Sequence, residues 1–193
     1  MDLDAIDVFD LDGTLIKANS FREITKRTML VLLKHFKLIP AFALIGSYIL
    51  RRTRIWSHIV FAKCAVNIFE KGLTEEEKRE ICQTVFDENV NDSVLERILA
   101  SKCSVICTAS PYPYVSRMSF GKDITVISAL DPRGFFPDIA NIGDGKVKNL
   151  IAYFGRNKIC VANLYTDSFD DQPLINLAEN AFMCRHGHIQ KIK

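Results

Sequence analysis

The feature that most constrains the fold lies in residues 5–15, where an apolar run leads into two carboxylates, Asp10 and Asp12. The run has the character of a buried strand, and Gly13 and Thr14 then turn the chain. This places both carboxylates at the carboxyl end of a strand, where open α/β sheets hold their ligands. One carboxylate there suits a nucleophile, and the other suits a general acid and base. A turn with solvated charges is the alternative.

The rest of the chain predicts an α/β protein with a mostly parallel sheet. After residue 100, short apolar runs alternate with helical patterns, whereas residues 17–100 carry few strand signals. We therefore expect a Rossmann-like core formed by residues 1–16 and 101–193, with a helical cap, residues 17–100, inserted after the first strand. The expected later strands are 104–107, 124–127, 158–165 and 181–184, the expected core helices are 146–154 and 171–178, and a turn is expected at 131–134.

Composition narrows the function. The 193 residues are 48% hydrophobic and 25% charged, as in an ordinary folded protein, and the net charge of +2 gives no indication of a nucleic-acid partner. The six cysteines form no C-x-x-C pair, so we expect reduced core thiols rather than a zinc site. The acidic start of the chain lacks the features of a secretion signal, and a cytoplasmic protein is expected.

Four motifs in a fixed order resemble the signatures of the haloacid dehalogenase superfamily. They are residues 10–14, 105–108, 143–150 and 164–174. The resemblance covers the whole chain. It implies phosphoryl transfer with Mg²⁺ as the cofactor, on a Rossmann-like core with an inserted cap.

The second motif supplies the expected phosphate-binding groups. Thr108 ends a strand and aligns with the hydroxyl residue of the superfamily. Its hydroxyl and the free main-chain N–H groups that follow, at Ala109 and Ser110, suit phosphoryl oxygens, as does the loop at Gly13. A turn before proline without a ligand is the alternative.

The third motif implies a catalytic lysine. Lys146 aligns with the lysine that neutralises the attacking carboxylate and the phosphoryl oxygens in the superfamily. Lys148 is the alternative within the same helix.

The fourth motif implies a metal ligand, Asp167. Together with Asp10 and the main-chain carbonyl of Asp12, it would hold Mg²⁺, which prefers hard oxygen ligands and keeps several waters.

Asp171 and Ser168 are implied to support the metal shell. Asp171 is also expected to pair with Lys146 and to cap the following helix. Thr166 stands where the family pattern has glycine, so the backbone angle at this position is in question.

The resemblance implies a two-step reaction. Asp10 attacks phosphorus and forms an aspartyl-phosphate, while Asp12 protonates the leaving alcohol and then deprotonates the hydrolytic water. Asp12 favours a phosphatase or phosphomutase over a dehalogenase, which needs no acid at this position. A phosphotransferase or mutase, and a catalytically silent binding module, are the alternatives.

The cap segregates charge. Residues 22–63 hold nine Lys or Arg residues against Glu23 alone, and residues 38–50 carry no charge. The uncharged run is too short to span a bilayer, which takes about 20 residues. Residues 38–54 therefore form either a buried cap helix or an interfacial helix in peripheral contact with an anionic membrane.

The cap and the last three motifs are similar to those of the helical-cap branch (subfamily IB) related to phosphoserine phosphatase, which includes bacterial phosphatidylglycerophosphatase C. This implies a phosphorylated small molecule or a lipid phosphate as substrate, with cytoplasmic localisation at or near the inner membrane surface. Asn19 and Ser20, with Phe21 and Arg22, are expected at the substrate entrance. Residues 186–188, His-Gly-His, are expected to form a turn rather than a metal site.

Overall fold

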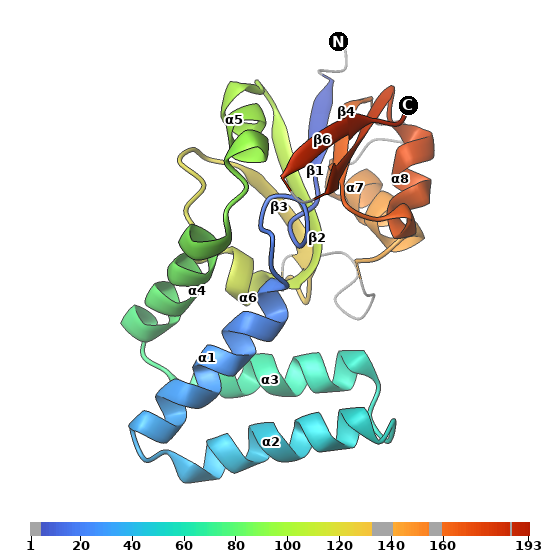
Figure 1. Ribbon diagram of the computed structural model, residues 1–193. Helices are drawn as coiled ribbons and strands as arrows, with labels where there is room; N and C mark the ends of the chain where they lie inside the picture. Colours follow the sequence, from blue (N-terminus) through green and yellow to red (C-terminus); the bar gives the residue numbers. More distant parts are fainter. Residues whose placement is uncertain (1–4, 133–140, 155–159, 186) are drawn as a thin grey trace.

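The computed structural model describes residues 5–132, 141–154, 160–185 and 187–193. Within them, one six-stranded sheet has the order β3-β2-β1-β4-β5-β6 (Figure 1). All neighbouring pairs are parallel except β5 and β6. The strands are β1 (Ile6–Phe9), β2 (Ser104–Pro111), β3 (Thr125–Ala129), β4 (Val161–Thr166), β5 (Asn180–Arg185) and β6 (His188–Lys191). The predicted α/β class with a mostly parallel sheet is confirmed.

Five helices separate β1 from β2 in the chain. They are α1 (Ser20–Lys34), α2 (Leu38–Arg52), α3 (His58–Gly72), α4 (Glu75–Asn89) and α5 (Asp92–Ala100). In Figure 1 the chain leaves β1 at the lower end of the sheet, and α1, α2 and α3 extend below it, whereas α5 lies beside the upper part of the sheet. The helical character predicted for this block is confirmed from Ser20 onward, and its division into a cap domain stays a prediction.

The helices after β2 pack mainly against the sheet. They are α6 (Tyr112–Val115), α7 (Asp144–Phe154), the 3₁₀ helix η1 (Phe169–Asp171) and α8 (Gln172–Leu177). The predicted helix 146–154 thus begins two residues earlier. The predicted helix 171–178 begins one residue later, because residues 169–171 form the tighter 3₁₀ turn.

Two hydrophobic cores cover the two faces of the sheet. Successive side chains of β1 point to opposite faces, so Val8 belongs to one core and Phe9 to the other. The core that contains Phe9 continues into the inserted helices through residues such as Ile24 and Phe69, which are both fully buried. These helices therefore share a continuous apolar interior with one face of the sheet.

The end of the chain differs from the prediction. Residues 181–184 do not close the sheet, because β6 turns back and pairs antiparallel with β5. The hydrophobic pattern missed β6 since only Ile189 of its four residues is apolar, and three of the four are exposed. The predicted turn before it is confirmed for Gly187, which has φ +83°. His186 and the second half of the predicted turn at 131–134, residues 133 and 134, lie outside the described residues.

The cysteines agree with the predicted core thiols in part, because Cys82, Cys107 and Cys184 are buried whereas Cys64, Cys103 and Cys160 are only partly buried. All six lie in the described part of the chain, and none forms a disulfide bond. Among the described helices, none is long and apolar enough to cross a membrane.

Candidate active site

Polar side chains converge where β1, β2 and β4 end. These strands are neighbours and run parallel, so their carboxyl ends meet at one edge of the sheet. Asp10 follows β1 directly, Thr108 and Ser110 lie in the last part of β2, and Thr166 ends β4. The second strand is longer than the predicted 104–107, and this extension carries both hydroxyl residues.

An ion-pair network buried from solvent forms the centre of the site. The Nζ atom of Lys146 donates to Oδ1 of Asp10 at 2.7 Å and to Oδ2 of Asp171 at 2.8 Å. The exposed fractions of the three residues are only 4% for Lys146, 8% for Asp10 and 4% for Asp171. One ammonium thus bridges two carboxylates that lie far apart in the sequence. Lys148, the alternative lysine, is exposed on the same helix.

Asp171 occupies the cap position of α8 but does not cap it. Its side chain makes no capping hydrogen bond. Its Oδ2 instead accepts from Lys146 and from the Thr166 hydroxyl at 2.8 Å. The expected helix cap is wrong, because the stronger charge-assisted bonds to Lys146 turn the carboxylate inward.

Thr166 is a residue whose contribution sequence reasoning missed. It is fully buried, and its hydroxyl orients Asp171 besides accepting from the Ser168 main-chain N–H at 3.3 Å. It is not among the described residues with positive φ, so a side chain fits here without backbone strain. The sequence did contain a signal for this role. Threonine replaces the family glycine at position 166 and adds a hydroxyl next to the predicted metal ligand Asp167.

Asn141 was also missed. Its side-chain amide is fully buried and donates to the carbonyl oxygens of Thr108 at 2.8 Å and Ile127 at 3.0 Å, while Asn149 donates to its Oδ1 at 2.9 Å. These bonds tie the segment before α7 to β2 and β3, and so fix the helix that carries Lys146. A lone asparagine before a helix gives no sequence signal for this role.

The carboxylate of Asp12 is held from two sides. Its Oδ1 accepts from the Ser20 main-chain N–H at 2.9 Å, and its Oδ2 accepts from the Ser110 hydroxyl at 2.8 Å. The hydroxyls of Ser20 and Ser110 lie 2.5 Å apart. Asp12 is therefore fixed between the start of α1 and the end of β2.

Gly13 allows Asp167 to approach the loop. Gly13 has φ +79°, and a Cβ atom built on it would lie 2.1 Å from Oδ2 of Asp167. Only glycine leaves room for this carboxylate and adopts this angle at low cost. The loops that follow β1 and β4 are thereby brought into contact.

Burial shifts the pKa values of the acids. Burial raises the pKa of Asp10 to about 7, although Lys146 opposes the shift. Burial also raises the pKa of Asp12 and of Asp167. Burial alone would lower the pKa of Lys146, but Asp10 and Asp171 outweigh it and hold this pKa above its ordinary value. The ammonium is therefore charged at neutral pH.

The other predicted site residues lie at the edges of this arrangement. Asn19 caps α1 by accepting from the Arg22 main-chain N–H at 2.9 Å, and the Ser168 hydroxyl accepts from the Asp170 main-chain N–H at 3.0 Å. Ala109 is exposed on β2 between Thr108 and Ser110. Their predicted roles in binding stay predictions.

The donor set fits a hard divalent cation. Lys146 donates a hydrogen bond to Oδ1 of Asp10, and no described residue donates to Oδ2 of Asp10. The Gly13 gap admits the Asp167 carboxylate next to the same loop. Within the described residues no group of three or more His, Cys, Asp or Glu side chains is assembled for a metal. The predicted set needs only two side chains, Asp10 and Asp167, with the main-chain carbonyl of Asp12, and such oxygen ligands suit Mg²⁺.

A cavity of about 690 Å³ lies between α1, α2 and α3. Phe21 and Arg22, which follow Ser20 directly, are among its lining residues. Its polar lining includes four cations, Arg22, Lys26, Arg51 and Arg52, besides Thr25 and His58. Burial and the neighbouring Arg51 lower the pKa of His58. The apolar lining includes Met29, Leu44, Tyr48 and Phe61.

Comparisons with known proteins agree with this geometry. The sequence profile of a family described as haloacid dehalogenase-like hydrolase matches residues 8–176. No curated protein sequence gives a significant match. The crystal structure of a protein of unknown function from Bordetella pertussis Tohama I is similar, with 16% identity and a TM-score of 0.62, over 93% of this chain and 89% of that chain. The crystal structure of a phosphoserine phosphohydrolase-like protein from Francisella tularensis subsp. tularensis SCHU S4 has 14% identity and a TM-score of 0.49, over 92% of this chain and 85% of that chain. At these identities, the Bordetella likeness shows the fold alone.

The Gly13 contact predicts a costly substitution. Gly13→Ala is expected to lower the free energy of unfolding by about 2 kcal/mol or more, because it combines a left-handed backbone with a clash against Asp167. The control is Gly46→Ala in α2, where no heavy atom lies within 4 Å and helix propensity favours alanine. Urea unfolding measures both, and equal effects at the two glycines would contradict the close approach.

The raised pKa of Asp10 predicts a pH dependence of the metal-free protein. The native state keeps the Asp10 proton up to about pH 7, whereas the unfolded chain releases it near the ordinary carboxyl pKa of 3.8. The native state therefore binds more protons in this window, and this contribution to stability falls as pH rises. The stability of Asp10→Asn relative to wild type should increase through the window and level off above it. Urea unfolding across the pH range measures this, with the exposed Asp170→Asn as a control; a constant difference would contradict the prediction.

Proposed function

The chain belongs to the haloacid dehalogenase-like hydrolase family, and from this membership we propose that it is a Mg²⁺-dependent phosphomonoester hydrolase acting through an aspartyl-phosphate on Asp10. The observation that carries the proposal is the buried contact of Lys146 with Asp10 at 2.7 Å, beside a second carboxylate, Asp12, held on two hydroxyl-bearing residues. Nucleophile, charge neutralisation and general acid are thus present at one edge of the sheet.

Asp10 is the nucleophile. Its carboxylate oxygen attacks the phosphorus of the substrate, the bond from phosphorus to the leaving oxygen breaks, and the phosphoryl group is transferred to Asp10. Lys146 offsets the repulsion between the anionic nucleophile and the anionic substrate. Because Asp171 and Thr166 hold the ammonium in place, little reorganisation is needed during the transfer.

Asp12 is the general acid and base. Burial raises the pKa of Asp12, which favours the protonated form that the first step needs. It donates this proton to the leaving alkoxide, and the resulting carboxylate then deprotonates the water that hydrolyses the aspartyl-phosphate. The bonds from Ser20 and Ser110 keep the carboxyl group at a fixed position between these steps.

The phosphoryl oxygens bind at the end of β2. The Thr108 hydroxyl is buried and accepts from the Ser110 main-chain N–H at 3.1 Å. Its own proton, with the main-chain N–H of exposed Ala109, is directed to the substrate. Asp10, Asp167 and the main-chain carbonyl of Asp12 would hold Mg²⁺, which would supply charge neutralisation of the phosphoryl group.

The leaving group enters the cavity between α1, α2 and α3. The cavity combines aromatic side chains such as Phe21 with cations such as Arg22. It therefore favours a leaving group that has both apolar and anionic parts. Two substrate classes can supply such a leaving group: a small phosphorylated metabolite and a lipid-linked phosphate.

Removal of the nucleophile tests the proposal. Asp10→Asn is expected to lower phosphate release from phosphomonoesters by about a thousandfold or more, because the amide cannot act as the carboxylate nucleophile. Asp170→Asn, at an exposed acid of the neighbouring loop, should retain wild-type activity. Chelation of Mg²⁺ should abolish activity and its return should restore it. Substantial turnover by folded Asp10→Asn would refute the assignment.

Replacement of the acid tests its separate role. Asp12→Asn should lower the rate of phosphoryl transfer by about 10²–10⁴-fold for an alkyl phosphate, whose alkoxide needs a proton. The loss should be much smaller for p-nitrophenyl phosphate in this first step, because p-nitrophenolate leaves without one. Stopped-flow kinetics of p-nitrophenolate release, with mass spectrometry of the phosphoenzyme, separates the two steps. An equal loss with both substrates would show that Asp12 is not the acid.

A further inference from the structure

The outer face of α2 is apolar although it faces solvent. Ala41, Leu44 and Ser47 form the buried inner face, which packs within the cap. On the other side, Ile39 is 86% exposed, Phe42 64% and Ile49 53%. Each of the two predictions for residues 38–54 thus corresponds to one face of α2. The inner face is buried, as in a helix of the interior, and the outer face is an exposed apolar stripe, as in an interfacial helix.

The connection between α1 and α2 continues this surface. The α1 helix ends in a Schellman motif, in which the Phe36 N–H donates to the Leu33 carbonyl at 3.0 Å and the Lys37 N–H donates to the Leu32 carbonyl at 2.8 Å. The left-handed position of this motif normally favours glycine, but here it is Phe36, with φ 53°. Phe36 is 86% exposed, so its ring adds strain without adding to the core. Folding alone does not explain this residue.

Cations flank the stripe at both ends. Lys34 and Lys37 precede it, and Arg51, Arg52 and Arg54 follow it. Among the described residues, no carboxylate forms an ion pair with any of the five. The chain has no acidic residue between Glu23 and Glu70, so the whole segment has one sign of charge.

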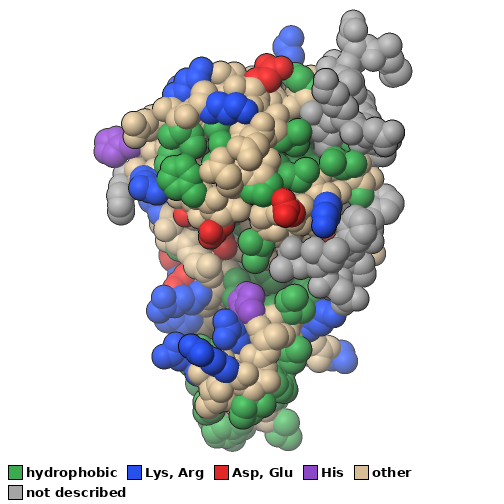
Figure 2. Space-filling view, turned by 90° about the vertical axis from the view of Figure 1, so that its right-hand side faces the viewer, with side chains coloured by type: hydrophobic (Ala, Val, Ile, Leu, Met, Phe, Trp, Pro, Cys, Tyr) green, Lys and Arg blue, Asp and Glu red, His purple; other side chains and the backbone are tan. Residues whose placement is uncertain are grey.

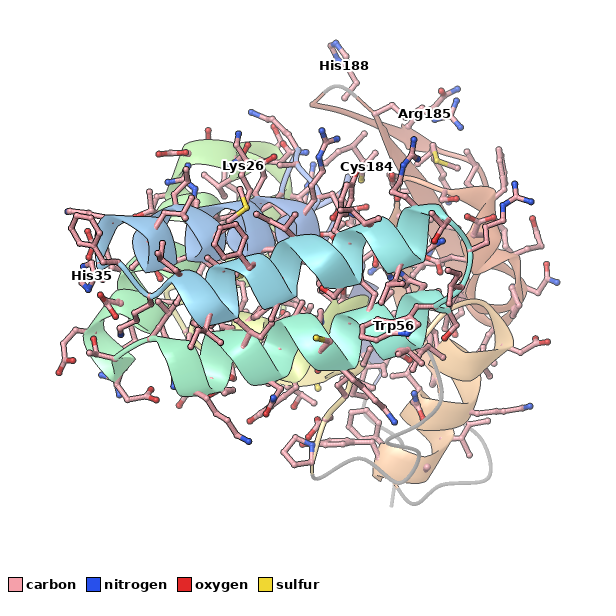
Figure 3. All side chains as sticks on the ribbon, turned by 90° about the horizontal axis from the view of Figure 1, so that it is seen from below. Lys26, His35, Trp56, Cys184, Arg185 and His188 are labelled. Carbon is pink, nitrogen blue, oxygen red and sulfur yellow. The ribbon has the colours of Figure 1, made fainter. Side chains whose placement is uncertain are left out.

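The pictures place this surface at one end of the molecule. In Figure 1, α2 is the lowest element, at the opposite end from both termini. Figure 2 shows hydrophobic side chains at the lower end of the molecule with Lys and Arg side chains directly above them. Seen from below in Figure 3, α2 and α3 lie nearest the viewer, His35 marks the end of α1, and Trp56 lies at the turn between α2 and α3.

We propose that this tip, formed by Phe36, Lys37 and the outer face of α2, binds the surface of an anionic lipid bilayer. An apolar stripe between clusters of cations is the pattern of a helix that lies in the headgroup boundary. The 15 residues of α2 rise about 22 Å, which suits a helix parallel to the surface rather than one that spans the hydrocarbon core of about 30 Å. The cations meet anionic headgroups while Phe36, Ile39 and Phe42 enter the apolar boundary.

Charge favours a bilayer over a second copy of this chain. A two-fold contact through the same face would bring two sets of unpaired cations together without any acid to offset them. An anionic bilayer neutralises the cations and covers the apolar stripe at once. The proposal does not depend on the proposed enzymatic activity.

Flotation of the full chain with vesicles tests the proposal. The protein should float with phosphatidylcholine vesicles that contain phosphatidylglycerol, float less with phosphatidylcholine alone, and dissociate as salt is added. Trp56 is the only tryptophan of the chain, so a shift of its emission to shorter wavelengths should accompany binding. Failure of the wild-type protein to float with the anionic vesicles would overturn the proposal.

Variants distinguish docking from folding. Ile39→Glu with Phe42→Glu should lower the partition onto anionic vesicles by about a hundredfold or more. The matched control replaces two other exposed apolar residues, Leu99→Glu with Tyr153→Glu, and should bind as wild type. Phe36→Gly should weaken vesicle binding by about tenfold yet raise the thermal unfolding midpoint, because glycine relieves the left-handed strain.

Two further outcomes would reject the proposal. If the Ile39→Glu, Phe42→Glu variant floats like wild type, the bilayer contact lies elsewhere. If sedimentation without vesicles finds a stable dimer that this variant dissociates, a second copy covers the face. Phosphate release from a soluble phosphomonoester, measured on the same samples, reports on the enzymatic proposal separately and should be unchanged in this variant.

Discussion

The site depends on one buried ammonium between two carboxylates. Lys146, Asp10 and Asp171 are almost inaccessible to water, so each charge is costly unless the others remain in place. Loss of one partner from such a group costs about 3–5 kcal/mol, because the remaining charge is buried without compensation. The triad carries one more negative than positive charge. Burial is the main cause of the raised pKa of Asp10 in the metal-free protein, and the neighbouring carboxylate of Asp171 adds to it. A divalent cation would offset this excess negative charge.

Topology assembles this network from distant parts of the chain. Lys146 and Asp10 are separated by 136 positions, yet they meet because β1, β2 and β4 are adjacent and parallel. Two small-scale features then set the geometry. Gly13 leaves room for Asp167, and Thr166 orients Asp171. The parallel strands bring the loops of the site close to one another. The contacts of Gly13 and Thr166 then position the side chains so that they can form hydrogen bonds.

Sequence reasoning predicted the architecture well where one physical signal dominated. The apolar runs of β1 and β4 and the periodicity of α7 were sufficient, because buried elements need continuous apolar surface. The β6 strand was missed since an edge strand with one solvent face needs few apolar residues. In the site, Asp10 and Lys146 were predicted from motifs and lie in contact, although their roles stay predictions.

The supporting residues were less predictable. Thr166 and Asn141 contribute through buried hydrogen bonds to groups distant in the sequence, and such partners are set by tertiary structure alone. For Asp171, the same dependence on tertiary structure made a local prediction wrong. A local rule predicted a helix cap, but a longer-range ion pair took the carboxylate.

The α2 helix shows why periodicity could not decide the nature of the cap. An uncharged run that is apolar on both its buried and its exposed face does not show from sequence whether the helix is buried or interfacial. Only the packing against α3 and α1 assigns Leu44 to the interior and Phe42 to the outside. Ile39 and Phe42 on the outer face are mostly exposed, so polar residues at these positions would leave the buried inner face intact. The composition of that outer face is therefore a constraint from outside the fold, and Phe36, held in a strained conformation with its ring in solvent, is subject to the same constraint.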